Sequence, residues 1–270
     1  MTRYSLGSDD REIERLDQQS SWLEEPTRLL LRLAGIEPGM RVLDLGTGLG
    51  HVAFALADLV GRTGQVVGLD NDDRMIAAAS ARAGGRSNVH FTKGDVRTWT
   101  CDESFDAIVG RLILFHLPDA VAAVRHHLPH LGRGARFVAI DYDVGACRAE
   151  PPAPLIDPVR QRVIDAFRSA GADPMVGTRL ASILADAGLA VTQSIGVQGY
   201  IAPDDPRGAA MLAGVVGSLA PQMAAAGIAT IAELGLETLQ DRLAAALQAT
   251  RSVLLPPTLV GAWGRLPEQR

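Results

Sequence analysis

Short apolar runs alternate with amphipathic stretches through the first half of the chain. Runs at residues 42–45, 66–70, 89–92, 105–109 and 136–140 are rich in Val, Ile, Leu, Ala and Phe. Runs of this length are typical of strands that are covered on both faces. The stretches between them carry helical spacing, so the pattern predicts a parallel sheet with right-handed crossover helices.

Residues 1–35, before the first predicted strand, are expected to form a helical N-terminal arm. One helix is predicted to begin near Ser8, where acidic residues suit a first turn. A second helix is predicted over residues 26–34, because proline fits a first helical position and Gly35 ends the apolar pattern. The arm either packs against the core or also lines a site, and the candidates for lining are Tyr4, Gln18, Gln19 and Trp22.

The second half of the chain continues the sheet and interrupts it with helices. A proline-rich stretch at residues 150–154 predicts a linker. Asp205 and Pro206 suit an N-cap and a first helical position, and Thr230 with Glu233 forms a capping-box pattern. The further elements are helices over residues 156–170, 178–188 and 230–250, a sixth strand over residues 190–201 and a final strand over residues 258–263.

Together these elements predict an α/β core of seven strands with helical additions. The insertions leave the sheet near its expected ligand edge, where a helical cap would exclude water from a pocket. The chain thus divides into a helical N-terminal arm at residues 1–35, a core at residues 36–145, 176–202 and 256–270, and helical cap insertions at residues 146–175 and 203–255.

A glycine-rich turn follows the first strand. Gly46, Gly48 and Gly50 allow backbone angles and a close ligand approach that a Cβ atom would block. The helix over residues 51–60 directs its free N–H groups and its positive dipole end at this turn, which is the geometry of a nucleotide-type pocket. The spacing is G-x-G-x-G, with Asp44 two positions earlier, and differs from the dinucleotide pattern G-x-G-x-x-G.

Two further acids follow the next strands. Asp70 ends the second strand, where a carboxylate suits the two hydroxyls of a ribose. Asp95 follows the third strand and is expected beside Asp70, where it can accept a hydrogen bond from an adenine amino group. The alternative is that both are surface acids at strand ends.

Four motifs in this order resemble a known family. VLDLGTGLG, GLDND, FTKGDVR and FDAIVGRLILFHLPD, within residues 40–141, resemble the class I S-adenosylmethionine-dependent methyltransferases, in particular the bacterial small-molecule branch related to quinone biosynthesis. The resemblance implies a Rossmann-like, mostly parallel sheet whose last strand is antiparallel, S-adenosylmethionine as cofactor and S-adenosylhomocysteine as product.

The resemblance also implies a set of cofactor contacts. Backbone at Gly46 and Gly48 is expected to hold the methionine part, while Asp70 holds the ribose. Asp44 either contacts the cofactor or only organises the turn, and Arg111 contacts the cofactor carboxylate or the substrate, or makes a salt bridge. The complete predicted set is Asp44, Gly46, Thr47, Gly48, Asp70, Asn71, Met75, Gly94, Asp95, Val96, Gly110 and Arg111.

Methyl transfer is an in-line displacement that removes the positive charge of a sulfonium, so the protein mainly has to orient the reactants. A base is needed only if the nucleophile must lose a proton. His116, just past the fourth strand, is the candidate base, or else a packed loop residue. Asp141 and Tyr142 end the fifth strand and are candidates for orienting a substrate; their spacing does not suit a metal, and none is predicted.

A second group of histidines is interpreted differently. His126, His127 and His130 lie in a predicted helix before a glycine turn. They are interpreted as surface residues on the exposed side of that helix.

Charge and composition narrow the classes of partner. The 270 residues carry a formal charge of −5 and no polybasic stretch, which argues against a nucleic-acid substrate. Cys101 and Cys147 are expected to be reduced thiols, and the first residues lack the apolar run of a signal peptide, so a cytoplasmic protein is expected. The apolar residues 209–228 are interpreted as a packed helix of a lid or of a homodimer contact rather than a membrane span.

The leading hypothesis is methyl transfer to a small natural product or quinone-like acceptor. Gly110, Arg111 and Leu112 stand where the Asn/Asp-Pro-Pro-aromatic motif of amino methylation would follow the fourth strand, and that loop has no cysteine for pyrimidine C5 methylation. The alternatives are a protein that binds the cofactor but catalyses a step such as cyclisation, and an NAD-dependent oxidoreductase, which would need the G-x-G-x-x-G spacing.

Overall fold

A computed structural model describes residues 10–267, without the side chains of residues 10–16, 18, 19 and 21. The chain divides into two compact units. Among the described residues, the larger unit, here the core unit, consists of residues 16–141, 176–196 and 260–267, and the smaller unit, here the cap unit, of residues 10–15, 142–175 and 197–259.

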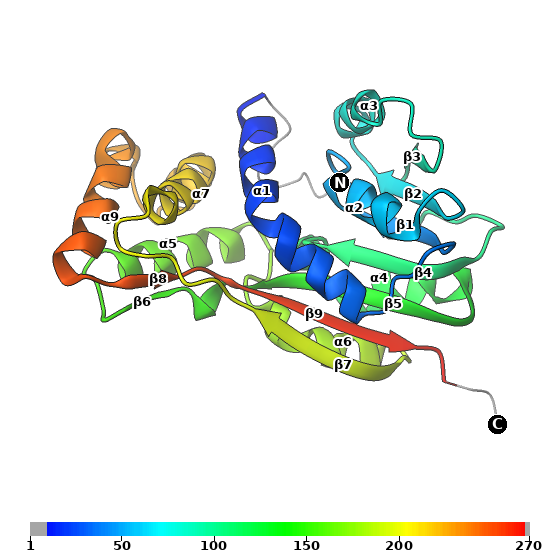
Figure 1. Ribbon diagram of the computed structural model, residues 1–270. Coiled ribbons are helices and arrows are strands. Elements are labelled where there is room, and N and C mark those ends of the chain that lie inside the picture. The colour runs from blue at the N-terminus through cyan, green and yellow to red at the C-terminus, as the bar shows by residue number, and fades with distance from the viewer. Residues whose placement is uncertain (1–9, 268–270) are drawn as a thin grey trace. The chain divides into compact units, whose positions relative to one another are not determined.

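A seven-stranded sheet organises the core unit, in the order β3-β2-β1-β4-β5-β9-β7. The pairs β1–β2, β1–β4, β2–β3 and β4–β5 are parallel. Figure 1 shows that β9 runs opposite to β4 and β7, so the predicted Rossmann-like sheet with an antiparallel last strand is confirmed. The strands are β1 Arg41–Leu45, β2 Gln65–Asp70, β3 Val89–Lys93, β4 Phe105–Arg111, β5 Leu131–Asp143, β7 Ala190–Val197 and β9 Thr258–Arg265.

Helices cover both faces of this sheet, with α1 and α2 on one side and α4 and α6 on the other (Figure 1). Val42 and Leu43 of β1 are completely buried, as expected for a strand between two helical layers. The helices are α1 Asp10–Leu33, α2 His51–Val60, α3 Asp73–Arg82, α4 Ala120–His127 and α6 Leu180–Asp186, with short 3₁₀ turns η1 Leu114–His116, η2 Leu128–His130 and η4 Val176–Arg179.

The register of the sheet brings the candidate residues together. Leu45 at the end of β1 pairs with Leu69 of β2 and with Gly110 of β4. Asp70 pairs with Lys93 at the end of β3. The loops that follow these four strands therefore leave one edge of the sheet at nearly the same level.

The N-terminal arm differs from the prediction of two helices. α1 is a single helix from Asp10 to Leu33 and contains Pro26. Proline removes one backbone hydrogen bond inside a helix. Contacts on both sides of Pro26 hold the two halves, since Asp17 bonds Arg82 of α3 at 2.6 and 2.8 Å and Arg28 bonds Asp58 of α2 at 2.8 Å.

The cap unit is mainly helical, and its helix starts follow the sequence signals. The Asp205 side chain accepts from Arg207 N at the start of α7, and Thr230 and Glu233 form the predicted capping box. Its elements are the 3₁₀ turn η3 Val144–Ala146, β6 Arg148–Glu150, α5 Ile156–Ser169, α7 Pro206–Ala225, α8 Ile231–Leu234, α9 Leu236–Thr250 and β8 Val253–Leu255.

The apolar helix α7 packs within this unit against α5 and α9 and buries Leu212, Val216 and Leu219. By length and composition alone, α7 would also be able to cross a membrane, but a packed helix of a cap passes the same test.

Several predicted boundaries shift. The linker around residue 150 begins with β6, which pairs antiparallel with β8. Gly235, at φ 56°, divides the predicted helix over residues 230–250 into α8 and α9. β7 ends at Val197 rather than at residue 201, and β5 begins at Leu131 rather than at residue 136.

Candidate cofactor and catalytic site

The glycine turn after β1 forms a loop whose backbone only glycine adopts easily. Gly46, Gly48 and Gly50 have φ values of 67°, 51° and 84°. A Cβ atom on Gly46 would lie 2.8 Å from Ile113 Cδ1, whereas a Cβ atom on Gly48 would meet nothing within 4 Å. The loop is thus packed at Gly46 and open at Gly48, directly before the N-terminus of α2.

Asp70 connects the end of β2 to this loop. Its Oδ2 accepts a hydrogen bond from Gly48 N at 2.8 Å, and its Oδ1 accepts one from Asp72 N at 3.0 Å. Burial raises the pKa of Asp70, and these backbone N–H groups oppose the rise. The predicted ribose acid therefore lies beside the glycine loop.

Asp44 and Thr47 have buried oxygens with unused hydrogen-bonding capacity. Asp44 is 1% exposed, and burial raises its pKa to about 7, while the nearby Thr47 hydroxyl opposes the rise. Among the described residues, however, neither Asp44 Oδ2 nor Thr47 Oγ1 has a partner in hydrogen-bonding geometry. Buried polar atoms rarely remain unpaired, so a ligand with N–H donors, such as the ammonium group of S-adenosylmethionine, fits here.

The loop after β3 carries Asp95 and Val96. The Asp95 carboxylate accepts from Arg97 Nε at 2.9 Å and from Arg97 N at 2.9 Å, and Arg97 lowers the pKa of Asp95. Val96 is buried, and Gly94 lies so close to Trp99 that a Cβ atom would be 2.4 Å from Cδ1 of that ring. Asp95 is ionised and held in place by its own turn.

Asn71 and Met75, the other predicted residues after β2, differ in exposure. Asn71 is exposed, whereas Met75 is 5% exposed in the first turn of α3. The Asp72 side chain caps α3 by accepting from Arg74 N at 2.8 Å.

Arg111 ends β4 and turns toward α1. Its Nη1 donates to Thr27 Oγ1 at 3.1 Å and its Nη2 lies 3.4 Å from Ser20 Oγ. Gly110, just before it, lies against Ile113, since a Cβ atom would be 2.8 Å from Cγ2 of that residue. The guanidinium is thus fixed from a helix more than 80 residues earlier in the chain.

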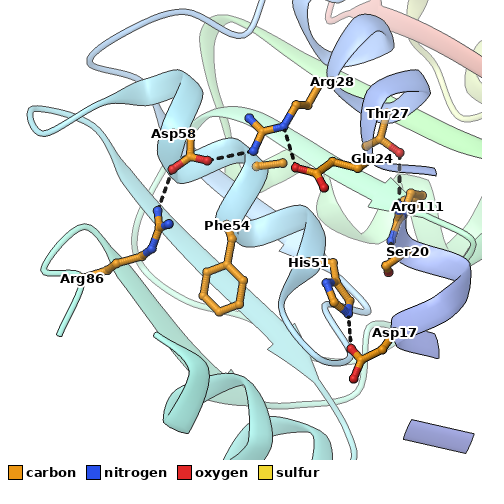
Figure 2. Close-up of a pocket in the computed structure, with 11 residues that line it drawn as sticks. Asp17, Ser20, Glu24, Thr27, Arg28, His51, Phe54, Asp58, Arg86 and Arg111 are labelled. Carbon is orange, nitrogen blue, oxygen red and sulfur yellow. Dashed lines mark hydrogen bonds and ion pairs between the residues drawn. The ribbon is translucent and has the colours of Figure 1, made fainter. Parts of the chain in front are cut away.

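A pocket of about 400 Å³ extends from Arg111 along α1 and α2. Figure 2 shows Ser20, Thr27 and Arg111 at one end, and His51 with Asp17 next to them. His51 Nε2 lies 2.9 Å from Asp17 Oδ1. Sequence reasoning missed this His–Asp pair, because only the fold places α1 beside the start of α2.

Of the four arm candidates, only Trp22 has a side chain within the described part of the structure. Trp22 is half-buried. Tyr4 and the side chains of Gln18 and Gln19 lie outside the described part of the structure.

His116, the candidate base, lies in η1 and is half-buried. Asp141 is 1% exposed, and its Oδ2 accepts from Phe115 N at 3.1 Å. This carboxylate therefore fixes the backbone next to His116. Tyr142, the next residue of β5, is half-buried.

Leu112, between Arg111 and η1, has a φ of 54°, which is rare for a leucine. Its N–H donates to Ile140 O at 2.8 Å. Strained backbone often accompanies functional sites, and here it bends the chain sharply between Arg111 and His116.

The surface interpretation of the second histidine group is wrong for two of its three members. His127 is 0% and His130 is 6% exposed, while His126 is half-buried. Backbone carbonyls elsewhere in the fold accept hydrogen bonds from His126 and His127, and these bonds allow the rings to leave water.

Comparisons with known proteins agree with this geometry. Residues 36–166 match the family model described as Methyltransferase domain. A probable cobalt-precorrin-6B C(15)-methyltransferase (decarboxylating) from Thermoplasma volcanium is 31% identical over 50% of this chain and 67% of its own length. The chain belongs to the class I S-adenosylmethionine-dependent methyltransferases.

Other methyltransferases match a similar share of the chain. A 2-phytyl-1,4-naphtoquinone methyltransferase from Synechococcus elongatus is 31% identical over 51% of this chain and 58% of its own length. The match thus covers 67% and 58% of the lengths of these two curated relatives. Their named substrates are properties of those proteins.

Solved structures show that the fold is shared more widely. The YcgJ protein from Bacillus subtilis has a TM-score of 0.54 at 21% identity, covering 89% of this chain and 98% of its own. The [4+2]-cyclase SpnF has a TM-score of 0.52 at 19% identity, covering 90% of this chain and 81% of its own. At these identities the likeness shows the fold alone, and the fold carries more than one chemistry.

No group of three or more His, Cys, Asp or Glu side chains suited to a metal ion occurs among the described residues.

Proposed function

We propose that this protein transfers the methyl group of S-adenosylmethionine to a small-molecule acceptor, a natural product or a quinone-like compound. The observation that carries the proposal is the glycine loop, open at Gly48 and flanked by Asp70 and by the buried, unpaired oxygen of Asp44. When bound, the cofactor supplies an electrophilic methyl on a positively charged sulfur.

The four charged residues of the predicted cofactor set have roles that fit their positions. Asp44 accepts from the ammonium group of the methionine part, and Arg111, aligned by Ser20 and Thr27, pairs with its carboxylate. Asp70 accepts from the ribose hydroxyls in addition to Gly48 N. Asp95 accepts from the adenine amino group, with Gly94 and Val96 beside the ring.

On the acceptor side, His116 takes a proton from an acceptor whose nucleophile must lose one. Asp141 keeps His116 in place through the N–H of Phe115, and Tyr142 orients the acceptor. A neutral imidazole is needed for this role.

Three features support a small-molecule acceptor: the charge of the chain, the named substrates of its relatives and the cap unit. The chain has no polybasic stretch for nucleic acid, and one relative acts on a naphthoquinone by its name. We propose that the cap unit serves as the lid that excludes water during transfer, and that the protein acts in the cytoplasm.

Calorimetric titration tests the cofactor first. S-adenosylmethionine and S-adenosylhomocysteine are expected to bind in the micromolar range, and NAD is expected not to bind. Mass spectrometry of the purified protein beforehand detects any ligand carried over from the cells. Binding of NAD, or no binding of the two sulfur compounds to a folded protein, would overturn the proposal.

The nature of the product separates methyl transfer from the alternative of cyclisation. Acceptor candidates are incubated with protein and cofactor and followed by mass spectrometry. Methyl transfer adds one CH₂ to the acceptor and forms S-adenosylhomocysteine, whereas cyclisation yields an isomer and leaves the cofactor intact.

Replacing Asp70 tests the assignment of the ribose contact. Asp70→Ala is expected to weaken cofactor binding by at least about tenfold, since a hydrogen bond to a charged group contributes roughly 1.5–3 kcal/mol. Asp73→Ala is the matched control, because this neighbouring acid is exposed and pairs with Lys93. Unchanged affinity of Asp70→Ala in calorimetry would remove Asp70 from the ribose site.

A further inference from the structure

The last turns around α4 lie against the loop that carries Asp95 and Val96. We propose that His126 and His127 are positioning residues, which fix this loop and thereby set the preference of the site for adenine over other purine bases. The inference rests on the proposed function, since it concerns the base of the same cofactor.

Two hydrogen bonds join the histidines to the loop. His127 Nε2 lies 2.7 Å from Val96 O, and His126 Nε2 lies 2.8 Å from Trp99 O. Because a carbonyl oxygen only accepts, both Nε2 atoms carry the proton and donate. The carbonyl of Val96 follows Asp95 directly, so the bond from His127 acts at the position where the base would be recognised.

The loop is a compact turn that these bonds attach to α4. Asp95 O accepts from Thr98 N at 2.9 Å and from Trp99 N at 2.8 Å, which closes the turn internally. The Trp99 ring packs on Gly94 and lies 5.9 Å from the ring of His130. The turn keeps its own shape. Gly94 N, at its start, donates to Asp70 O at 2.9 Å at the end of β2, and the two histidines attach its far side to α4.

Directional bonds matter here because base recognition is sensitive to small displacements. An acceptor displaced by about 1 Å loses most of a hydrogen bond to an amino group. Without these bonds, the packing of the Trp99 ring would hold the loop. The two histidine donors also fix the backbone carbonyls of Val96 and Trp99, on both sides of Arg97. His127 is completely buried, so water cannot replace its bond to Val96.

The test compares variants that keep or remove the donor. In His127→Gln, the amide Nε2 can reach the place of the imidazole Nε2 and donate to Val96 O. His127→Leu has a similar volume and no donor. His130→Gln is the control, because His130 packs against Trp99, and its Nε2 has no partner among the described residues.

Two ligands are titrated into each variant by calorimetry: S-adenosylhomocysteine, and its inosine analogue, which lacks the amino group of adenine. Wild type is expected to prefer the adenine compound by about tenfold or more. His127→Leu is expected to lose most of this preference, and His127→Gln and His130→Gln to retain it. His126→Leu is expected to reduce the preference less, because His126 is only half-buried.

The outcomes separate this inference from the proposed function. If wild type binds S-adenosylhomocysteine with a preference for adenine and His127→Leu keeps that preference, the positioning role is refuted and the cofactor assignment stands. Equal loss of both ligands in His127→Leu would show a purely structural role and refute the inference. No binding of either ligand by folded wild type would overturn both.

Discussion

The two sides of the sheet edge differ in how much of their hydrogen-bonding capacity the protein itself uses. Around β1 and β2, Asp44 Oδ2 and Thr47 Oγ1 are buried without a partner among the described residues, and Gly48 borders open space. Around β4 and β5, Arg111 is bound by Thr27 and Ser20, and Asp141 by the N–H of Phe115.

This difference distinguishes residues that are available to bind a ligand from residues that stabilise the fold. Unpaired buried atoms cost stability, so they persist where a ligand completes them. Paired buried groups fix the backbone around them. We therefore expect removal of an unpaired buried charge to weaken binding without weakening folding, and loss of a paired buried group to weaken folding.

The largest expected effect concerns the pH dependence of stability through Asp44. The folded protein keeps this carboxyl protonated up to about pH 7, whereas the unfolded chain loses the proton near the ordinary value of 3.8. The Asp44 contribution to the free energy of unfolding thus falls by at most about 4 kcal/mol as pH rises from about 4 to about 7. In Asp44→Asn the side chain cannot ionise, so this decrease in the free energy of unfolding is absent.

Denaturant unfolding of the ligand-free protein at several pH values measures the effect. The stability of Asp44→Asn relative to wild type should rise across this pH window, while Asp102→Asn, at an exposed position, should show no such rise. A difference that does not change with pH would mean that Asp44 is ionised in the folded protein and paired.

Asp141, in contrast to Asp44, is a buried carboxylate that accepts a hydrogen bond within the protein. Asp141→Ala leaves the buried N–H of Phe115 without its acceptor, so the free energy of unfolding is expected to fall by about 2–3 kcal/mol at neutral pH. Denaturant unfolding checks this, with the half-buried Asp143→Ala as the control from the same strand. If Asp141→Ala keeps its full stability but loses cofactor affinity, Asp141 binds the ligand and does not stabilise the fold.

The third prediction concerns Gly48, and its effect on binding is similar in size to the effect of Asp141 on stability. Adding a methyl group in Gly48→Ala fills the open space of the loop and is expected to weaken S-adenosylhomocysteine binding by about 100-fold, or ~2.7 kcal/mol. Gly227→Ala, in the cap unit, has the same kind of backbone strain, with φ 68° and nothing within 4 Å of a Cβ atom. Both variants should lose about 1 kcal/mol of stability from the positive φ. If Gly48→Ala and Gly227→Ala bind S-adenosylhomocysteine equally well in calorimetry, the loop does not border the cofactor.

Much of the fold followed from local signals in the sequence. The strand at residues 42–45, the glycine turn and the helix at residues 51–60 are adjacent in the chain, so their pattern was enough to predict them. The capping box of Thr230 and Glu233 was also predicted correctly, because a cap involves only a few neighbouring residues. The roles of the individual cofactor and catalytic residues stay predictions.

The errors involve contacts between distant parts of the chain. His127 is buried because Val96, 31 residues earlier, accepts its hydrogen bond. α1 continues through Pro26 although proline usually starts or breaks a helix, and ion pairs from Asp17 and Arg28 to α3 and α2 hold it. None of these partners is recognisable from spacing in one sequence.

The position of β9 has a consequence for biosynthesis. β9 lies between β5 and β7, so β7 has no neighbour in the sheet until residues 258–265 have been made. While the ribosome adds residues 198–257, the nascent chain carries a finished strand that has nothing to pair with and an open edge on β5. Both edges invite pairing with other chains. The sheet is therefore completed only after residues 258–265 have been made, when this single late strand joins its two parts.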